Sequence, residues 1–213
     1  MSVTHVTARG ATKLVVITAG LSQPSSTRLL AERLLDATAT TLREGGATVS
    51  TEIIDLRSIA HDIVDTMLTG FAPERMEATI ETVTGADGLI LVTPLFTTTY
   101  SGLFKSFLDI LDKESLTGMP VLLGATGGTP RHSLALDYSM RPLLTYLRAQ
   151  VATTSVFAAT DDWAGSGDGV SPLPARITRA GRELAQLVES RGGHRATSVF
   201  DSPPSFDELM GGI

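Results

Sequence analysis

The segment 93–101, Thr-Pro-Leu-Phe-Thr-Thr-Thr-Tyr-Ser, carries five serine or threonine hydroxyls and two aromatic rings directly after the apolar run 88–92. In an open α/β sheet, ligands bind beyond the carboxyl ends of the strands, so a loop of this composition is placed to hold a flat, hydrogen-bonding ring. We expect backbone amides around 95–98 to contact heteroatoms of that ring, and Phe96 and Tyr100 to border its faces. A capped loop with core aromatics is the alternative for the same residues.

The loop 20–27, which follows the first apolar run, is rich in hydroxyls and opens a helical pattern. Free amides at a helix N-terminus bind anions, and the helix dipole favours negative charge there. The loop therefore suits a terminal phosphate held without a metal, although ordinary N-capping would use the same residue types. Arg28 either pairs with that phosphate or lies on the helix surface. The candidate residues in the loop are Ser22, Gln23, Ser25, Ser26 and Thr27.

A third segment, Ala-Thr-Gly-Gly-Thr-Pro at 125–130, follows the fourth apolar run. Glycine lets a backbone approach a ligand closely, so the amides of Gly127 and Gly128 are candidate donors to a pyrimidine carbonyl. A plain glycine turn is the alternative. All three segments follow strands that we expect to be neighbours, and they leave from the same edge of the sheet, which favours one shared binding site.

The composition excludes several kinds of site. The chain has 213 residues and no cysteine, which rules out disulfides, thiolate metal ligands and a cysteine nucleophile. Its four histidines lack metal-binding spacing, and no Ser-His-Asp triad emerges, with His132 expected on the surface. A net charge of −6 without a basic cluster argues against nucleic-acid binding. Since no apolar run approaches the roughly 20 residues of a membrane span, we expect a cytoplasmic globular protein.

Apolar, β-rich runs alternate with helical patterns along the chain, which predicts a parallel sheet with right-handed crossovers. Five such units fit an α/β, flavodoxin-like doubly wound sheet in the order 2-1-3-4-5 with helices on both faces. A Rossmann dinucleotide domain would need Gly-x-Gly-x-x-Gly after the first strand, where this chain has a single glycine. The expected strands are 14–19, 48–56, 88–93, 119–125 and 153–158, and the expected helices are 28–44, 73–84, 101–111, 132–149 and 174–189.

Three stretches need separate treatment. Residues 57–71 are left unassigned. In the helix expected at 132–149, Pro142 removes a backbone hydrogen bond and should kink the helix. That helix is apolar on more than one face, so it packs against another subunit or is fully buried within the monomer. Residues 191–213 are expected to form a tail beyond a domain at 14–190, with Phe206-Asp-Glu-Leu-Met able to dock elsewhere.

At these residues the sequence resembles the NAD(P)H-dependent FMN reductases of two-component monooxygenase systems, in particular those paired with alkanesulfonate and luciferase-like monooxygenases. The similarity is densest over 88–150, through Thr-Pro-Leu-Phe…Tyr-Ser-Gly-Leu-Phe-Lys, Ala-Thr-Gly-Gly-Thr and Leu-Asp-Tyr-Ser-Met-Arg-Pro-Leu-Leu…Ala-Gln. The resemblance implies a flavodoxin-like fold with FMN at the strand ends, a homodimer or homotetramer, and hydride transfer from NAD(P)H to FMN. Reduced FMN would then leave for a separate flavin-dependent monooxygenase.

The resemblance also implies three groups of cofactor contacts and no catalytic side chain, because the cofactor performs the hydride chemistry. The phosphate would be held by Ser22, Ser25, Ser26, Thr27 and Arg28, the ring and ribityl chain by Pro94, Leu95, Phe96, Thr97, Tyr100 and Ser101, and the pyrimidine edge by Thr126, Gly127 and Gly128. Tyr138 matches a tyrosine that forms a π-bulge at a tetramer interface. The phosphate loop departs from the usual Gly-Ser-x-Arg, because Leu21-Ser22-Gln23 stands there.

These features favour an FMN reductase that releases reduced FMN to a partner oxygenase. FMN is expected in preference to FAD, because the phosphate loop has no recognisable site for an adenylate beside it. One alternative is an oxidoreductase that retains FMN and reduces quinones or azo compounds. The other is a flavodoxin-type electron carrier, which should be monomeric and show little NAD(P)H oxidation.

Overall fold

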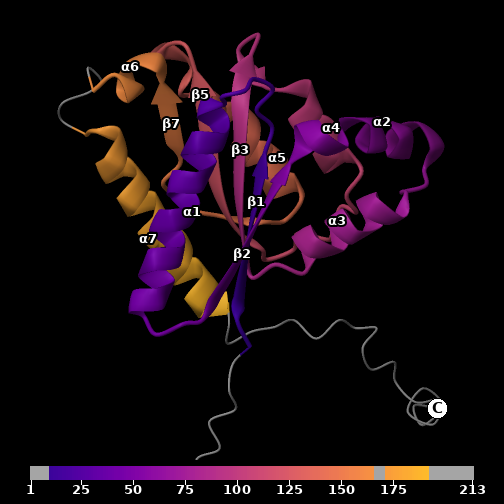
Figure 1. Cartoon of the computed structure of the whole chain (residues 1–213), viewed down its shortest axis with the longest axis horizontal. Helices are drawn as coiled ribbons and strands as arrows, with labels where there is room; N and C mark the ends of the chain where they lie inside the picture. Colours follow the sequence, from indigo (N-terminus) through magenta and orange to yellow (C-terminus); the bar gives the residue numbers. More distant parts are fainter. Residues whose placement is uncertain (1–9, 166–170, 192–213) are drawn as a thin grey trace, which may run out of the picture.

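The computed structural model describes residues 10–165 and 171–191, which form a mainly parallel sheet with helices on both faces (Figure 1). Its strands are β1 (Thr12–Thr18), β2 (Val49–Asp55), β3 (Gly88–Phe96), β4 (Thr99–Tyr100), β5 (Pro120–Gly127), β6 (Gln150–Val151) and β7 (Val156–Ala159). They run in the order β2-β1-β3-β5-β6, and β7 also pairs with β5. This order confirms the predicted 2-1-3-4-5 arrangement.

Alternation of side chains along the strands divides the core between two helical layers. The helices are α1 (Ser26–Glu44), α2 (Ala60–Thr69), α3 (Glu74–Thr84), α4 (Gly102–Asp109), α5 (Arg141–Tyr146), α6 (Thr160–Trp163) and α7 (Leu173–Arg191). Leu14 and Val16 of β1 pack with α1 and α7, whereas Val15 and Ile17 pack with α2 to α5. Because both faces of the sheet are covered by helices, the central strands consist of continuous apolar runs.

The sheet has seven strands rather than the five expected, for two local reasons. β4 is a short antiparallel partner of β3, and together they form a hairpin. The strand predicted at 153–158 starts only at Val156, as β7, and a separate short strand, β6, precedes it at 150–151, because side chains hold the backbone between the two. Arg141 donates hydrogen bonds to the carbonyls of Ala152 and Thr153, and the Glu183 carboxylate accepts hydrogen bonds from the amides of Thr153 and Thr154.

One unassigned stretch is helical, and one predicted helix needs correction. The stretch 57–71 is mostly covered by a 3₁₀ turn that begins one residue earlier, Leu56–Ile59, and by α2. The helix predicted at 132–149 is instead a 3₁₀ turn at Pro130–His132, a π-helical turn at Leu136–Met140 and then α5. Pro142 lies in the first turn of α5, which follows directly on the π-helical turn.

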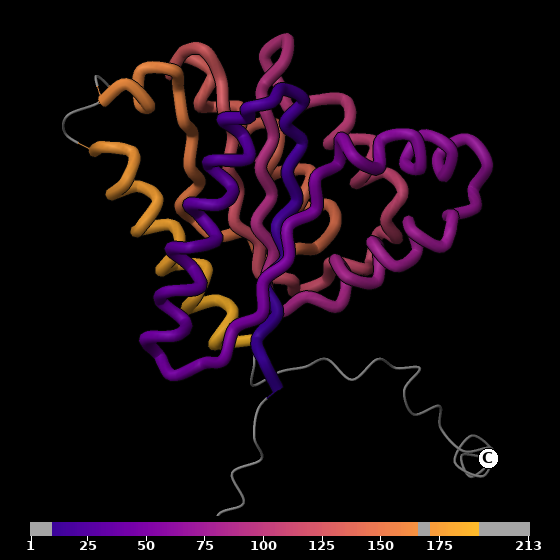
Figure 2. Tube along the Cα trace, viewed as in Figure 1, coloured from indigo at the N-terminus to yellow at the C-terminus, as the bar shows by residue number. Residues whose placement is uncertain are grey.

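The functional edge of the sheet is the one at which β1, β3, β5 and β7 end and α1 begins, at the top of the view (Figure 2). Of the tail predicted at 191–213, Arg191 is the last residue of α7, and 192–213 lie outside the described residues. Within the described part of the chain, no helix is long and apolar enough to cross a membrane.

Candidate flavin-binding cleft

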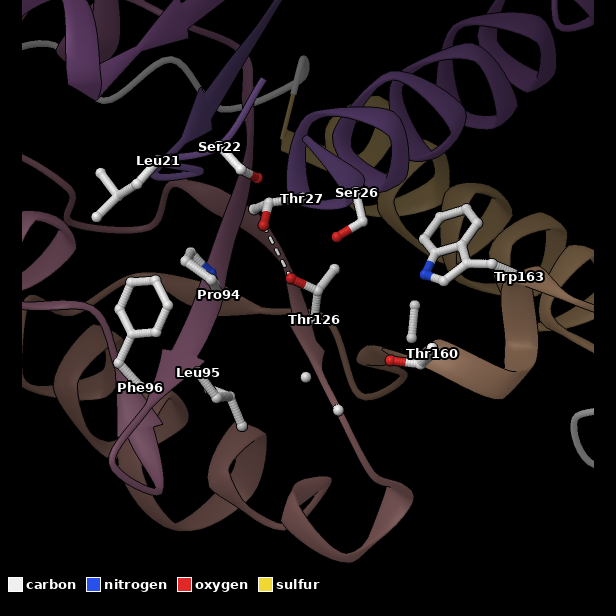
Figure 3. Close-up of a pocket in the computed structure, with 13 residues that line it drawn as sticks. Leu21, Ser22, Ser26, Thr27, Pro94, Leu95, Phe96, Thr126, Thr160 and Trp163 are labelled. Carbon is white, nitrogen blue, oxygen red and sulfur yellow. Dashed lines mark hydrogen bonds between the residues drawn. The ribbon is translucent and has the colours of Figure 1, made fainter. Parts of the chain in front are cut away.

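A cleft of about 500 Å³ opens at this edge of the sheet, where the loops after four strands converge (Figure 3). Its size lies within the range of about 300–1,000 Å³ typical of small-molecule sites. It is lined by Leu21, Ser22, Ser26, Thr27, Pro94, Leu95, Phe96, Thr126, Gly127, Gly128, Ala158, Thr160 and Trp163. Residues from all three loops that were predicted to share one site thus line the same cleft.

The first loop brings the N-terminus of α1 to the cleft. Ser25 is the N-cap of α1, and its hydroxyl accepts a hydrogen bond from the amide of Arg28 at 3.2 Å. A side chain at Gly20 would place Cβ 2.2 Å from that hydroxyl, so only glycine lets the loop fold back this closely. As a result, Ser22 and Ser26 face the cleft beside the amides of the first helical turn.

The side chain of Arg28 lies away from the cleft. Its Nε donates to Glu32 at 2.8 Å, and its guanidinium lies 4.0 Å from Asp55 of the neighbouring strand end. Of the two roles left open by the sequence, the structure places Arg28 on the helix surface. None of the lining residues carries a charge, so this cleft offers an anion only neutral donors, among them the amides at the N-terminus of α1 and the hydroxyls.

The hairpin of β3 and β4 forms one wall of the cleft, with Pro94, Leu95 and Phe96 on it. Its two-residue turn consists of Thr97 and Thr98, both with positive φ, at 50° and 75°. Such angles suit a tight hairpin, but β-branched residues adopt them only under strain. Strained backbone is found preferentially at functional sites, which agrees with a turn placed beside a ligand site.

Two predicted ring contacts have structural roles instead. Ser101 is the buried N-cap of α4: its hydroxyl accepts from the amide of Phe104 at 3.2 Å, and its own amide donates to the Thr93 hydroxyl at 3.1 Å. The ring of Tyr100 packs against that of Phe104, with centroids 6.0 Å apart. Both residues therefore hold the hairpin to α4 without lining the cleft.

The third loop contributes Thr126, Gly127 and Gly128 at the end of β5. The buried hydroxyls of Thr126 and Thr27 share a hydrogen bond of 2.8 Å, which ties the start of α1 to β5 (Figure 3). Gly127 needs no positive φ; it is required because an added Cβ would lie 2.9 Å from Cζ of Phe157. Gly128 has no such neighbour within 4 Å.

The structure brings together part of the predicted set and adds residues that sequence reasoning missed. The predicted residues that do not line the cleft are Gln23, Ser25, Arg28, Thr97, Tyr100, Ser101 and Tyr138. Tyr138 lies in the π-helical turn, as predicted, with 78% of its surface exposed. The missed lining residues are Leu21, Ala158, Thr160 and Trp163.

Three of the missed residues, Ala158, Thr160 and Trp163, lie at or just after the end of the fifth predicted strand, so the strand-end rule used for the other loops would have found them. Trp163 ends the short helix α6, which starts directly after β7. Asp162 fixes α6 to the strand end, because its carboxylate accepts from the amide of Ala159 at 2.8 Å and from the guanidinium of Arg176. Arg176 also donates to the carbonyl of Phe157 in β7.

Known proteins share this sequence and fold. The sequence model of the NADPH-dependent FMN reductases matches residues 12–164. The chain is 32% identical to an FMN reductase (NADPH) of Pseudomonas aeruginosa, over 84% of this chain and 94% of that protein. It is 33% identical to the NADH-dependent FMN reductase SfnE of Pseudomonas putida, over 86% and 94% of the two chains.

Among solved structures, an oxidoreductase from Corynebacterium diphtheriae has 43% sequence identity and a TM-score of 0.81, covering 84% of this chain and 98% of that one. The match to the family model, over residues 12–164, includes every residue that lines the cleft. The chain therefore belongs to the NADPH-dependent FMN reductase family.

Proposed function

We propose that this protein transfers hydride from NADH or NADPH to FMN and releases the reduced flavin to a separate flavin-dependent monooxygenase. The observation that carries the proposal is the convergence of a helix N-terminus, an apolar hairpin wall and a glycine pair on one cleft. An anion-binding helix end suits a phosphate, and the opposite wall suits a flat ring.

The residues present fit FMN. Ser22, Ser26 and the first amides of α1 would hold its phosphate, Leu95 and Phe96 would border its ring, and the loop of Gly127 and Gly128 would face its pyrimidine edge.

The flavin, when bound, supplies the hydride-accepting chemistry. The side chains of this chain bind and orient the reactants; no lining residue is titratable, so the cleft provides no general acid or base. Backbone amides at Gly127 and Gly128 would donate hydrogen bonds to the edge of the ring, where negative charge develops on reduction.

Release of the product is supported by the character of the cleft. Leu21, Ser22, Ser26, Phe96 and Gly128 are solvent-exposed, and no charged side chain lines the cavity, so exchange of a flavin needs no buried ion pair to break. We also propose that the enzyme works in the cytoplasm. We propose further that it is a homodimer or homotetramer, because Leu134, Tyr138 and Tyr146 are largely exposed on the layer of α5.

Steady-state oxidation of NADH and NADPH with free FMN tests the proposal. We expect saturable dependence on FMN, loss of flavin on gel filtration, and tighter binding of FMN than of FAD. Tightly retained FMN with turnover of quinones would instead favour a flavin-retaining reductase. A monomer that binds FMN but does not oxidise either nicotinamide would be an electron carrier, and FAD binding tighter by about tenfold would reject FMN as the working flavin.

A further inference from the structure

We propose that Trp163 is a specificity-determining residue for the phosphate group of FMN: its indole N–H donates a hydrogen bond to the phosphate and so distinguishes FMN from riboflavin. This inference rests on the proposed function. The chain contains a single tryptophan, and it is placed on the cleft. Neither its residue type nor its neighbours in the sequence indicated a ligand contact.

The position of Trp163 points to the phosphate end of the cleft. Figure 3 shows its ring on the same side as Ser26 and Thr160, whereas Leu95 and Phe96 lie on the opposite side. The edge of the indole that carries its nitrogen is turned toward the interior of the cleft. Within the described part of the chain, that nitrogen has no hydrogen-bond partner, and an indole N–H is only a donor.

The guanidinium of Arg33 packs on the face of the indole ring and restrains its orientation. The guanidinium of Arg33, two turns along α1 from Ser26, lies 5.1 Å from the centroid of the indole. A cation over the face of a tryptophan is attracted by its π-system, which restrains the ring. Asp162 and Arg176 also fix α6, which carries Trp163, to the end of β7, so the indole N–H is positioned before a ligand binds.

This donor matters because no charged side chain lines the cleft to bind a phosphate. The arginine expected to pair with the phosphate, Arg28, is engaged with Glu32 and Asp55 outside the cleft. A phosphate monoester must therefore be bound by neutral donors: the amides of α1, the hydroxyls of Ser22, Ser26 and Thr160, and Trp163. Hydrogen bonds to a charged acceptor are stronger than neutral ones, so the loss of one donor should be measurable. Arg33 adds positive potential behind the indole.

The test compares FMN and riboflavin, which differ only in the phosphate, on the native protein and on Trp163→Phe. Phenylalanine keeps an aromatic ring for Arg33 and removes the N–H. Quenching of flavin fluorescence gives both dissociation constants. We expect FMN binding to weaken by about tenfold, equivalent to about 1.4 kcal/mol, and riboflavin binding to change by less than about twofold. Thermal unfolding checks that the variant is folded.

Phe71→Leu serves as the matched control, because Phe71 is 81% exposed and does not line the cleft; it should leave both constants unchanged. Equal weakening of FMN and riboflavin by Trp163→Phe would show that the indole only packs, and unchanged binding of FMN would show that it makes no contact. Either result overturns this inference alone. If the native protein binds neither flavin, the proposed function fails and the inference fails with it.

Discussion

The hydrogen bond between the hydroxyls of Thr27 and Thr126 joins two loops that are 99 residues apart in the chain. Thr27 lies in the first turn of α1 and Thr126 near the end of β5, and both side chains are buried. Each hydroxyl satisfies the other, so the cleft is closed on this side without an unpaired polar atom. This pair of side chains thereby ties the start of α1 to the strand that leads into the glycine loop.

Replacing either threonine with valine keeps the side-chain shape but leaves the other hydroxyl buried and unpaired. We expect Thr27→Val and Thr126→Val each to lower the free energy of unfolding by about 1–3 kcal/mol. The double variant should recover much of this loss, because neither hydroxyl then remains unsatisfied. Urea denaturation of the four proteins measures the coupling. Strictly additive losses would contradict a direct interaction between the two side chains.

Gly127 and Gly128 are adjacent, yet a methyl group would have different consequences at each. At Gly127 it would lie 2.9 Å from the Phe157 ring, and we expect Gly127→Ala to destabilise the fold by about 1–3 kcal/mol through overpacking. At Gly128 it would meet no atom within 4 Å, so Gly128→Ala should keep native stability and weaken FMN binding. Thermal unfolding and flavin titration separate the two effects. Native FMN affinity in Gly128→Ala would show that the flavin does not approach the backbone closely at this residue.

At the scale of elements, the interruption between β6 and β7 determines where the last strand, β7, begins. Arg141 of α5 holds this segment from one face of the sheet through the carbonyls of Ala152 and Thr153 and the hydroxyl of Ser155. Glu183 of α7 holds it from the other face through two amides. Both helical layers thus position the strand that carries Thr160 and Trp163 to the cleft.

The contact between Glu183 and the segment that joins β6 to β7 depends on pH. Partial burial acts to raise the pKa of Glu183, but hydrogen bonds from Thr154 and Thr153 outweigh it and hold the pKa below its ordinary value of 4.5. Because the folded-state pKa is lowered, the charged form stabilises the fold above pH 4.5, and this contribution is lost as the pH falls through the folded-state pKa.

Glu183→Gln keeps an acceptor and removes the charge, so it should lower the free energy of unfolding at neutral pH by on the order of 1 kcal/mol. The difference from the native protein should shrink as the pH falls below 4.5. Denaturation at a series of pH values measures this, with the exposed Glu189→Gln on the same helix as the control. A difference that is constant with pH would mean that the charge of Glu183 does not contribute to its hydrogen bonds with the amides of Thr153 and Thr154.

The sequence predicted those elements that bury continuous apolar runs and missed those that depend on distant side chains. The strand order followed from the alternation of runs with helical patterns, and the lining residues Ser22 and Thr126 followed from the strand-end rule. The turn at Thr97 and Thr98 was not predictable, because hairpin turns with positive φ normally contain glycine or asparagine. The break before β7 depends on Arg141 and Glu183, which no local pattern connects to it.

Helix α2 and helix α6 were missed for different reasons. On α2, Ile63, Val64, Met67 and Leu68 recur at helical spacing, so this helix was readable from the sequence and was overlooked, although Val64, Met67 and Leu68 are exposed in the fold. Helix α6 has four residues and is held by a contact between Asp162 and Arg176 that only the fold creates. Sequence therefore located the cleft but not the side of it formed by Trp163.

At the scale of the whole molecule, both ends of the layer formed by α2 to α5 carry exposed apolar side chains. Leu134, Tyr138 and Tyr146 lie along the π-helical turn and α5, with 60%, 78% and 73% of their surfaces exposed. Leu68 and Phe71, at the end of α2, are 80% and 81% exposed. Large exposed apolar groups commonly mark interaction sites, so either set offers a surface for a second subunit.

We expect the subunit contact at Tyr138 rather than at Phe71. Tyrosine is enriched at interfaces, where its ring packs while its hydroxyl finds a partner, and π-helical turns occur preferentially at functional sites. Tyr138→Ala should therefore weaken the oligomer and allow FMN to copurify, as followed by sedimentation velocity and by the visible absorbance of the purified protein. Phe71→Ala, which removes an equally exposed ring, should leave both unchanged. If only Phe71→Ala dissociates the subunits, the interface lies at the end of α2 and Tyr138 has no part in assembly.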